Sequence, residues 1–356
     1  MLKNQYHVLG VMSGTSLDGI DLAEVFFTVD QGVWTYEFGH TQMLPYDEKR
    51  EKAFLADLVS LSPAELDAAD TRYSQFLGEQ IKVFIQEHNI MGLDAVCSHG
   101  HTALHRPDLG VTRQIGNQKQ LADIIGQRVV CDFRVQDVVL GGQGAPLVPI
   151  GDRLLFGDYD YCINLGGFAN LSYEQNGRRI AYDLCPVNII LNALVEPLGL
   201  AYDEGGKIAQ SGTVNDQLLK QLNSLDYYAQ QPPKSLGLEW VRSEIHNKFK
   251  LKTLNPEDAL ATLVEHMAFQ ISKPLKAKSK VLFTGGGAHN DYLLQRIESY
   301  KSLKIKVPNK QLIEYKEALI FALLGVLKLR DEVNCLASVT GARKDHSSGL
   351  IFNANI

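Results

Sequence analysis

The sequence lacks any hydrophobic run long enough to span a membrane. Its longest apolar run, from Ala318 to Leu327, is about half of what a membrane-spanning helix requires. The amino terminus, Met1 to His7, has no apolar core of the kind found in signal peptides. We therefore expect a cytoplasmic protein with no membrane partner.

Cysteine is scarce and scattered along the chain. The five cysteines are odd in number and never form a C-x-x-C pair: Cys97, Cys131, Cys162, Cys185 and Cys335. This pattern favours buried free thiols in a reducing compartment over disulfides or a zinc site. The sequence assigns no residue as a ligand of a resident metal.

Basic segments are lacking as well. The formal net charge is −6, and no run or stripe of Lys and Arg is present. This balance argues against nucleic acid as the main partner. The hydrophobic content of 45% is ordinary for a globular protein, and 356 residues exceed what one core usually supports, so we expect two domains.

Several familiar nucleotide-binding and catalytic motifs are missing. The sequence contains no P-loop, no G-x-G-x-x-G, no G-x-S-x-G and no protein-kinase H-R-D motif. If a nucleotide binds, it must therefore be held in another way.

What the sequence does contain is one order of elements, βββαβαβ, that occurs twice. Hydrophobic spacing and turn residues predict the first copy at 6–12, 20–29, 33–43, 62–85 (helix), 94–98, 117–125 (helix) and 128–133. The second copy is predicted at 161–165, 169–174, 179–184, 187–196 (helix), 280–284, 291–300 (helix) and 303–307. Further helices are predicted from Pro256 and over about 315–329, and residues 200–255 are predicted to be an irregular insertion.

The repeat predicts the domain organisation. We expect an N-terminal domain over residues 1–130 and a C-terminal domain over 131–334, with the insertion at about 200–255 in the second. The segment 335–356 is expected to return to the first domain. Two such α/β units facing one another would bring their glycine-rich and polar turns to a single cleft.

The first polar turn, Met12-Ser-Gly-Thr-Ser-Leu-Asp-Gly19, separates two strand-like runs. Its backbone N–H groups and short hydroxyls suit an anion, particularly a polyphosphate. The alternative is an ordinary hairpin turn built from turn-forming residues.

Two glycine clusters follow predicted strands. Gly285 to Gly287 would let a flat ring or a ribose approach the backbone in front of a helix, or would make a tight strand-to-helix connection. Gly166 and Gly167 could touch phosphate oxygens or could close a turn.

Three charged residues are candidates for chemistry. Asp183 stands just before a predicted helix, where it could act as a base or as an N-cap. Arg134 follows a buried strand and could clamp a carboxylate or phosphate, or form an inter-domain ion pair. Glu317 begins an otherwise apolar helix and is either a cap-region charge or a cleft residue.

His99, His101 and His105 suggest a metal hydrolase, because His-x-His at a strand end is a known ligand spacing. The alternative is polar substrate contact or structural hydrogen bonding. The remaining histidines do not fall at successive strand ends, and this favours the alternative.

An ordered set of motifs covers nearly the whole chain. In chain order they are Gly10-Val-Met-Ser-Gly-Thr-Ser-Leu-Asp-Gly-Ile-Asp21, Ser98-His-Gly-His-Thr102, Asp132-Phe-Arg134, Gly141-Gly-Gln-Gly-Ala-Pro-Leu-Val-Pro149, Asn164-Leu-Gly-Gly-Phe-Ala-Asn170, Pro233-Lys-Ser235, Thr284-Gly-Gly-Gly287, Glu317-Ala-Leu and Ser338-Val-Thr-Gly-Ala342. Each motif is weak alone, but their order makes the set specific. The set resembles the anhydro-N-acetylmuramic acid kinase family.

The resemblance implies an α/β fold with two ribonuclease-H-like domains of the actin, Hsp70 and sugar-kinase type, flanking an ATP cleft. It implies that ATP, Mg²⁺ and water convert 1,6-anhydro-N-acetylmuramic acid into N-acetylmuramic acid 6-phosphate and ADP, in peptidoglycan recycling. It also implies a homodimer. The alternative within the same fold is a nucleotide-driven conformational module, against which the retained Asp183 argues.

The resemblance also suggests roles for individual residues. Asp183 matches the family's catalytic aspartate, and we assign Glu317 to catalysis and Thr102, Arg134 and Asn188 to the substrate. Nucleotide binding is expected from Ser13, Gly14, Thr15, Ser16, Leu17, Asp18, Gly19, Ile20, Asp21, Gly166, Gly167, Gly285, Gly286 and Gly287.

The chain departs from the family pattern beside the catalytic aspartate. The family motif Asp-Thr-Gly-Pro-Gly-Asn is Asp183-Leu-Cys-Pro-Val-Asn188 here, so Cys185 and Val187 replace two glycines. Added bulk at these positions is expected to change how closely a ligand approaches the following helix. His101 stands where the family commonly has glutamine.

Overall fold

The computed structural model describes residues 3–14 and 17–355, with the side chain of Lys252 left out. The chain forms two compact units. Unit 1 comprises Met1–Leu155 and Tyr315–Ile356, and unit 2 comprises Phe156–Glu314. The divisions therefore fall after Leu155 and Glu314, whereas the sequence suggested divisions after residues 130 and 334.

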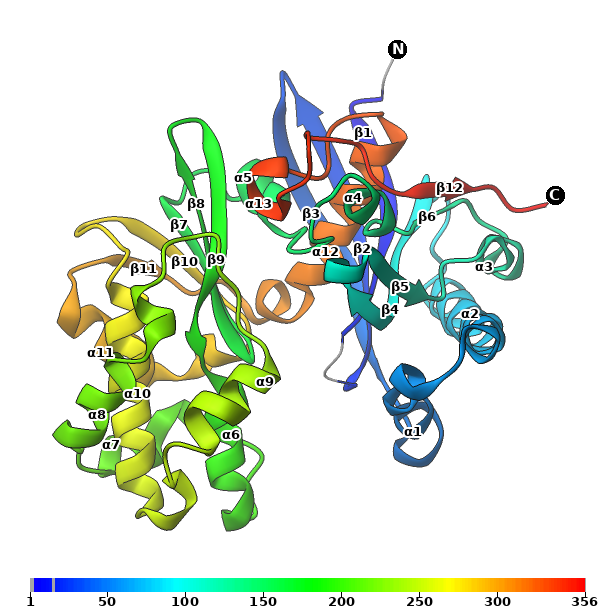
Figure 1. Cartoon of the computed structure of the whole chain (residues 1–356). Helices are drawn as coiled ribbons and strands as arrows, with labels where there is room; N and C mark the ends of the chain where they lie inside the picture. Colours follow the sequence, from blue (N-terminus) through cyan, green and yellow to red (C-terminus); the bar gives the residue numbers. More distant parts are fainter. Residues whose placement is uncertain (1–2, 15–16, 356) are drawn as a thin grey trace. The chain divides into compact units, whose positions relative to one another are not determined.

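Unit 1 is built on a mixed sheet with the strand order β12-β6-β4-β1-β2-β3, in which β5 pairs with β4 (Figure 1). β1 is antiparallel to β2 and parallel to β4. The strands are β1 (Gln5–Ser13), β2 (Gly19–Asp30), β3 (Val33–Pro45), β4 (Ala95–Arg106), β5 (Val111–Ile115), β6 (Val129–Cys131) and β12 (Leu350–Phe352). Because β12 pairs with β6, the end of the chain returns to the first sheet.

Local sequence explains the borders of the first elements. Gln31 and Gly32 have φ values of 47° and 83°, the left-handed backbone that a tight two-residue hairpin turn requires. Helix α2 (Pro63–Glu87) begins at a capping box in which Ser62 and Glu65 bond reciprocally, as the sequence predicted. The buried face of α2 packs on the sheet in a core that includes Leu9 and Leu77.

The prediction of a strand at 94–98 is correct in position but too short. β4 continues through the His99-Gly-His-Thr102 motif to Arg106 and forms a hairpin with β5, which the sequence did not predict. The polar residues of this extension show no clear apolar alternation, so its strand structure depends on pairing with β5.

Unit 2 repeats the sheet of unit 1. Its order is β11-β10-β7-β8-β9, which corresponds to β6-β4-β1-β2-β3 of unit 1 and is the order of a ribonuclease-H-like domain. The strands are β7 (Tyr161–Leu165), β8 (Phe168–Gln175), β9 (Arg178–Pro186), β10 (Lys280–Thr284) and β11 (Lys304–Lys306). The predicted turn at Asn176 and Gly177 is confirmed by φ values of 52° and 74°.

The prediction of an irregular insertion at 200–255 is wrong in part. This stretch contains α7 (Lys207–Ser211), α8 (Asp216–Asn223) and α9 (Leu238–Trp240), and Tyr227, Tyr228 and Ile245 lie in the core of unit 2. Of these, α7 and α8 pack against α10 (Pro256–Ser272), which is buried on most sides. Helices this short carry too little periodic signal to be recognised in the sequence.

Helix α12 (Lys310–Leu329) starts earlier than predicted, so Glu317 lies in its third turn and not at its start. The helix crosses β1 at very close range, because a Cβ on Gly10 would lie 2.1 Å from the carbonyl oxygen of Ala318. The remaining α-helices are α1 (Ala53–Ala56), α3 (Lys119–Ile125), α4 (Val135–Val139), α5 (Pro149–Leu155), α6 (Asn188–Val195), α11 (Asp291–Tyr300) and α13 (Ala337–Thr340).

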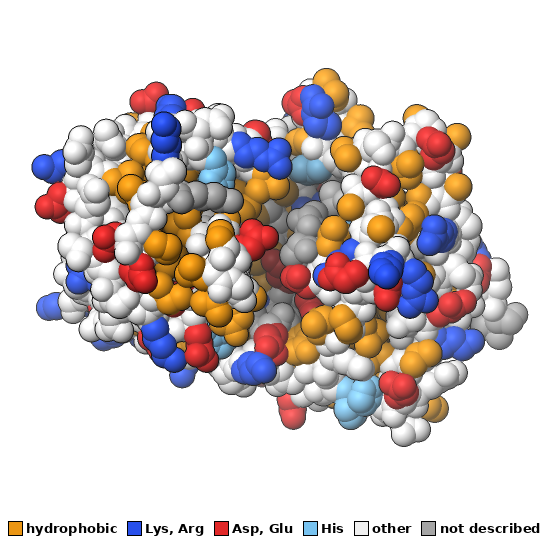
Figure 2. Space-filling view, turned by 90° about the horizontal axis from the view of Figure 1, so that it is seen from below, with side chains coloured by type: hydrophobic (Ala, Val, Ile, Leu, Met, Phe, Trp, Pro, Cys, Tyr) orange, Lys and Arg blue, Asp and Glu red, His pale blue; other side chains and the backbone are white. Residues whose placement is uncertain are grey.

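Three further observations concern membrane spans, surface charge and the cysteines. Within residues 3–14 and 17–355, no helix combines the length and apolarity needed to cross a bilayer. Figure 2 shows acidic and basic side chains intermixed on the face in view. All five cysteines are buried free thiols, as the sequence predicted.

Candidate functional site

A buried hydroxyl network lies at the carboxyl end of β1 in unit 1. The Ser13 Oγ lies 2.7 Å from the Tyr46 hydroxyl and 2.9 Å from His101 Nδ1. The Tyr46 hydroxyl in turn lies 2.7 Å from that of Tyr73. Burial lowers the pKa of His101 to about 4, so the ring is neutral near pH 7. The Ser13 hydroxyl thus has internal partners, so Ser13 would meet a ligand through its backbone.

The turn itself is bent by a left-handed residue. Leu17 has φ 60°, and its N–H donates to the carbonyl of Gly14 at 3.4 Å. Asp18 is exposed, so its carboxylate is open to solvent. The expected nucleotide-binding residues Thr15 and Ser16 lie outside the described residues.

The second half of the predicted nucleotide segment is part of the sheet. A Cβ on Gly19 would lie 2.2 Å from the carbonyl oxygen of Leu44, so strand packing already requires this glycine. Ile20 is a core residue, and Asp21 pairs with Met12 of β1. Ile20 could therefore meet a ligand only through its backbone.

Two of the three guanidinium nitrogens of Arg134 donate hydrogen bonds to residues of its own unit. Its Nε donates to His99 Nε2 at 2.8 Å, and its Nη1 donates to the carbonyl of Gly144 at 2.7 Å. Burial lowers the pKa of Arg134 to about 10, which leaves it charged near pH 7. Nη2 has no hydrogen-bond partner among residues 3–14 and 17–355. The positioned cation can therefore still bind an anion, and both of its partners lie in its own unit.

The histidines near Arg134 serve as hydrogen-bonding groups. His99 Nδ1 donates to the carbonyl of Gly100 at 2.9 Å, so Nε2 is free to accept from Arg134. Burial and the Arg134 charge hold the pKa of His99 well below its usual range. His105 Nδ1 lies 3.0 Å from Thr112 Oγ1. In the described part of the chain, the three histidines do not form a group that could share a metal ion.

Glu317 and Thr102 lie in the same unit as Arg134. The Glu317 side chain is exposed, yet the protein around it raises its pKa, and the charges of Arg134 and Lys316 oppose that rise. The neighbouring Lys316 is buried in an ion pair with Asp152 at 2.8 Å, which fixes α12 to α5. Thr102 is half-buried, and its hydroxyl accepts from Gln114 at 3.5 Å.

Asp183 lies inside β9 of unit 2, and its carboxylate is held by two donors. The N–H of Leu236 donates to Oδ2 at 2.8 Å, and the amide of Asn170 donates to Oδ1. Burial raises the pKa of Asp183, while these two hydrogen bonds lower it. Helix α6 begins only at Asn188, and the Asp183 carboxylate makes no cap contact to it, so the capping alternative is wrong.

The loop at residues 227–236 holds Asp183 in place, and the sequence predicted no role for it in the site. The Asp183 N–H donates to the carbonyl of Lys234 at 3.2 Å, and its carbonyl accepts from the Tyr227 hydroxyl at 2.7 Å. The Lys234 ammonium lies 4.6 Å from the centroid of the Tyr227 ring. The motif Pro233-Lys-Ser235 marked this stretch, but a contact across 53 residues has no local signal.

The glycines after β10 have different structural needs. Gly285 has φ 79°, and a Cβ on Gly287 would lie 2.8 Å from the Leu165 Cβ, so packing explains both. A Cβ on Gly286 would meet only the Asn188 amide nitrogen, at 3.9 Å. The Gly286 backbone is therefore open to close approach by another molecule.

The turn between β7 and β8 caps helix α6. The carbonyl of Gly167 accepts from the N–H of Val187 at 2.8 Å, and that of Gly166 accepts from the N–H of Asn188 at 3.3 Å. The Asn188 side chain donates to the carbonyl of Leu165 at 3.2 Å. Gly167 resembles Gly286 in having open space, with only Ile189 Cβ within reach at 3.8 Å.

Cys185 and Val187, which replace family glycines, point into the core of unit 2, and both are fully buried. A register shift in the pairing of β8 with β9, between Ala169 and Asn170, separates Cys185 from Asp183. The added bulk of Cys185 and Val187 therefore affects the packing of the core, and not the approach of a ligand to the following helix as expected.

Comparison with known proteins identifies relatives over nearly the whole chain. The family model for anhydro-N-acetylmuramic acid kinase matches residues 6–354. Proteins of that name from Pseudomonas syringae pv. syringae and Mannheimia succiniciproducens are each 34% identical, over 98% and 99% of this chain and 100% of each relative. A xylulose kinase structure from Lactobacillus acidophilus is similar at a TM-score of 0.43, with 11% identity over 98% of this chain and 94% of that one.

These matches identify the class as the sugar kinases. Within that class, the chain belongs to the anhydro-N-acetylmuramic acid kinase family. The resemblance inferred from the ordered motifs is confirmed.

Proposed function

We propose that this protein uses ATP and water to convert 1,6-anhydro-N-acetylmuramic acid into N-acetylmuramic acid 6-phosphate and ADP. The proposal rests on family membership and, within the structure, on one observation: the Asp183 carboxylate is fixed by two donors while burial raises its pKa. A carboxylate of this kind is suited to accept a proton from water.

The reaction needs a base near the anomeric carbon. The water oxygen bonds to C1, the C1–O6 bond breaks, and O6 bonds to the γ-phosphorus as the bond to the β,γ-bridging oxygen breaks. The proton of the attacking water passes to the Asp183 carboxylate. Opening the anhydro ring in this way releases O6 as a nucleophile without a separate base at the phosphate.

We assign the cation of Arg134 to the lactyl carboxylate of the substrate, because Nη2 is the guanidinium nitrogen without a partner among the described residues. Thr102 and Asn188 are proposed as further sugar contacts. Glu317 is assigned to catalytic support, since its exposed carboxylate lies in the electrostatic field of Arg134.

The nucleotide is proposed to contact backbone at residues 13–21, 166–167 and 285–287. Open space at Gly286 and Gly167 supports this, because the fold alone does not require glycine there. Mg²⁺ accompanying ATP would offset the charge of the phosphates, and Asp18 offers an exposed carboxylate for it. A cytoplasmic homodimer is proposed as the working form.

Labelled water tests the reaction. A single turnover with ATP, Mg²⁺ and anhydro-N-acetylmuramic acid in ¹⁸O-water is expected to place one heavy oxygen at C1 and none in the phosphate. The control is finished product held in the same water for the same time, which measures exchange by ring opening. Label in the phosphate, or no product from folded protein, would contradict the proposal.

The two neighbouring glycines give a matched test of the nucleotide loop. Gly286→Val adds bulk where space is open and is expected to raise KM for ATP by roughly tenfold or more, with little change in thermal stability. Gly287→Ala forces its Cβ against Leu165 and is expected to lower the free energy of unfolding by about 1–3 kcal/mol. An unchanged KM for ATP in Gly286→Val would remove this loop from the nucleotide site.

The pH dependence of kcat/KM is expected to change when a hydrogen-bond donor to the Asp183 carboxylate is removed. The base must be ionised, so kcat/KM rises with pH through its pKa. Asn170→Ala removes a donor that lowers this pKa, and the acid limb of the profile is therefore expected to move to higher pH. A limb that stays in place, or moves to lower pH, would show that another group controls it.

A further inference from the structure

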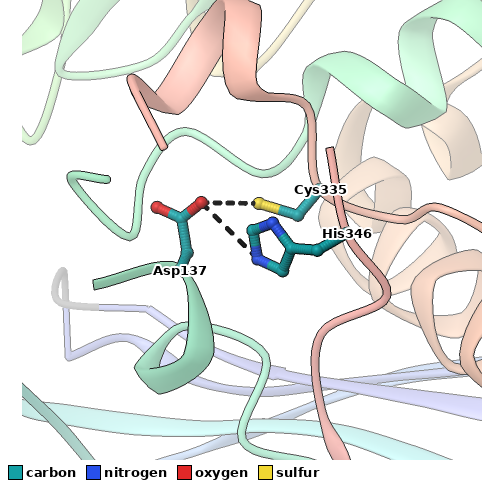
Figure 3. A group of neighbouring side chains, drawn as sticks. All are labelled: Asp137, Cys335 and His346. Carbon is teal, nitrogen blue, oxygen red and sulfur yellow. Dashed lines mark hydrogen bonds and ion pairs between the residues drawn. The ribbon is translucent and has the colours of Figure 1, made fainter. Parts of the chain in front are cut away.

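Three potential metal ligands that the kinase chemistry does not use meet inside unit 1. Figure 3 shows Asp137 of α4 facing Cys335 and His346 of the C-terminal segment. Cys335 and His346 are joined by backbone hydrogen bonds in an isolated antiparallel bridge. The exposed fractions of Asp137, Cys335 and His346 are 0%, 1% and 5%.

The spacing of the three side chains suits a tetrahedral ion. Asp137 Oδ1 lies 3.0 Å from Cys335 Sγ and 3.6 Å from His346 Nε2, and all three ligand atoms lie within 4.8 Å of one another. Bond lengths of zinc to sulfur, nitrogen and oxygen place the ligands of a tetrahedral site roughly 3.3–3.6 Å apart. Small side-chain adjustments would therefore admit the ion.

The hydrogen bonds of His346 supply an independent argument. Its Nδ1 lies 3.1 Å from the carbonyl of Lys344, which can only accept, so Nδ1 carries the proton. In the neutral ring Nε2 then has a lone pair, and this buried atom has no hydrogen-bond partner among the described residues. Metal-binding histidines are typically held in this way, with the other ring nitrogen donating to a carbonyl.

The carboxylate beside this lone pair already has its donors. Thr340 Oγ1 donates to Asp137 Oδ1 at 2.7 Å, and the N–H of Gly144 donates to Oδ2 at 2.7 Å. A lone pair facing a carboxylate oxygen inside a protein is unfavourable unless a positive charge lies between or on them. A divalent ion would provide that charge, and a proton on Nε2 is the competing explanation.

We propose that Asp137, Cys335 and His346 bind a divalent transition-metal ion, Zn²⁺ by the nitrogen, oxygen and sulfur character of the ligands. Binding releases the thiol proton of Cys335 to solvent and leaves a thiolate on the ion. The Thr340 hydroxyl or a water molecule is available as the fourth ligand. Because all three side chains are buried, the site is structural.

The ion would tie the C-terminal segment to the loop that positions Arg134. Besides the Gly144 bond to Asp137, the N–H of Gln143 donates to the carbonyl of Thr340 at 2.8 Å. The carbonyl of Gly144 is the acceptor for Arg134 Nη1. The proposed ion therefore stabilises a loop next to the kinase site but takes no part in phosphoryl transfer.

Metal titration of the full-length protein tests the proposal. After treatment with a chelator, the protein is expected to bind one equivalent of Zn²⁺ and to melt at a higher temperature with the ion than without it. Co²⁺ is expected to give the thiolate-to-metal charge-transfer absorption of a cysteine ligand. Cys335→Ser and His346→Gln should each weaken Zn²⁺ binding by more than about a hundredfold, beyond the loss seen for outer-sphere changes.

The control variant is Cys162→Ala, which removes a buried thiol of unit 2 and should keep the Co²⁺ absorption. If Cys335→Ser fails to fold, the Co²⁺ charge-transfer absorption of the unaltered protein and of Cys162→Ala still tests whether a cysteine other than Cys162 binds the ion. Absence of stoichiometric binding, or binding unchanged in both ligand variants, would overturn the proposal. The proton on His346 Nε2 would then be the charge that the cluster contains.

Discussion

Asp183→Asn is expected to lower kcat/KM for the anhydro-sugar by about a thousandfold or more, at the upper end of general-base effects. Asparagine has the same shape and can still accept a hydrogen bond from the Leu236 N–H, so the loop at 234–236 should stay in place. What is lost is the capacity to accept a proton from water. The measurement is product formation at saturating ATP, with ATP affinity determined separately by calorimetry.

ATP affinity in Asp183→Asn is expected to change little, because the residue is assigned to the sugar and water and not to the nucleotide. Asp216→Asn is the matched control, since Asp216 is an exposed residue of α8 in the same unit. Activity within about tenfold of the unaltered protein would contradict the role of Asp183 as the base.

Arg134→Ala is expected to lower kcat/KM by two to three orders of magnitude, in line with about 2–5 kcal/mol for truncating one partner of a buried charge pair. Arg134→Lys should recover little. A lysine keeps the charge, but its ammonium group lacks the planar arrangement of donors that lets Arg134 bond to His99 and Gly144 and still present Nη2 to a carboxylate.

The substrate provides the sharper test of Arg134. With an anhydro-sugar that lacks the lactyl carboxylate, the unaltered protein should lose activity and Arg134→Ala should cause little further loss. Arg106→Ala is the control, because its ion pair with Asp108 is exposed at the surface and contributes little. Equal losses on both substrates would assign Arg134 to the phosphates or to the structure of its loop.

The site residues that the sequence predicted are those with a local signal, and their roles stay predictions. Gly285 to Gly287 follow a buried strand, and Asp183 stands in a short motif that resembles that of the family. The sequence could not separate Gly286, which is open, from Gly287, which packs on Leu165, because that difference depends on a strand more than a hundred residues earlier.

Two of the alternatives left open by the sequence were decided by contacts in the folded chain. The N-cap interpretation of Asp183 gave way because Leu236 and Asn170 hold its carboxylate, and α6 is capped by the carbonyls of Gly166 and Gly167. The histidine motif proved to be strand structure within β4, where His99 positions Arg134.

Local sequence alone determined the capping box at Ser62, the turn at Asn176 and Gly177, the helix start at Pro256 and the two glycine-rich turns, because each depends on residues within a few positions. The repeated order of strands and helices follows from the same short-range patterns. Only the tertiary structure decided that β4 extends to pair with β5, and that Asp137 meets Cys335 and His346 across about two hundred residues. The strand extension depends on the pairing of its polar residues with β5. The contact of Asp137 forms because the C-terminal segment returns to the loop after α4, where the N–H of Gln143 donates to the carbonyl of Thr340, and no short stretch of the chain encodes that return.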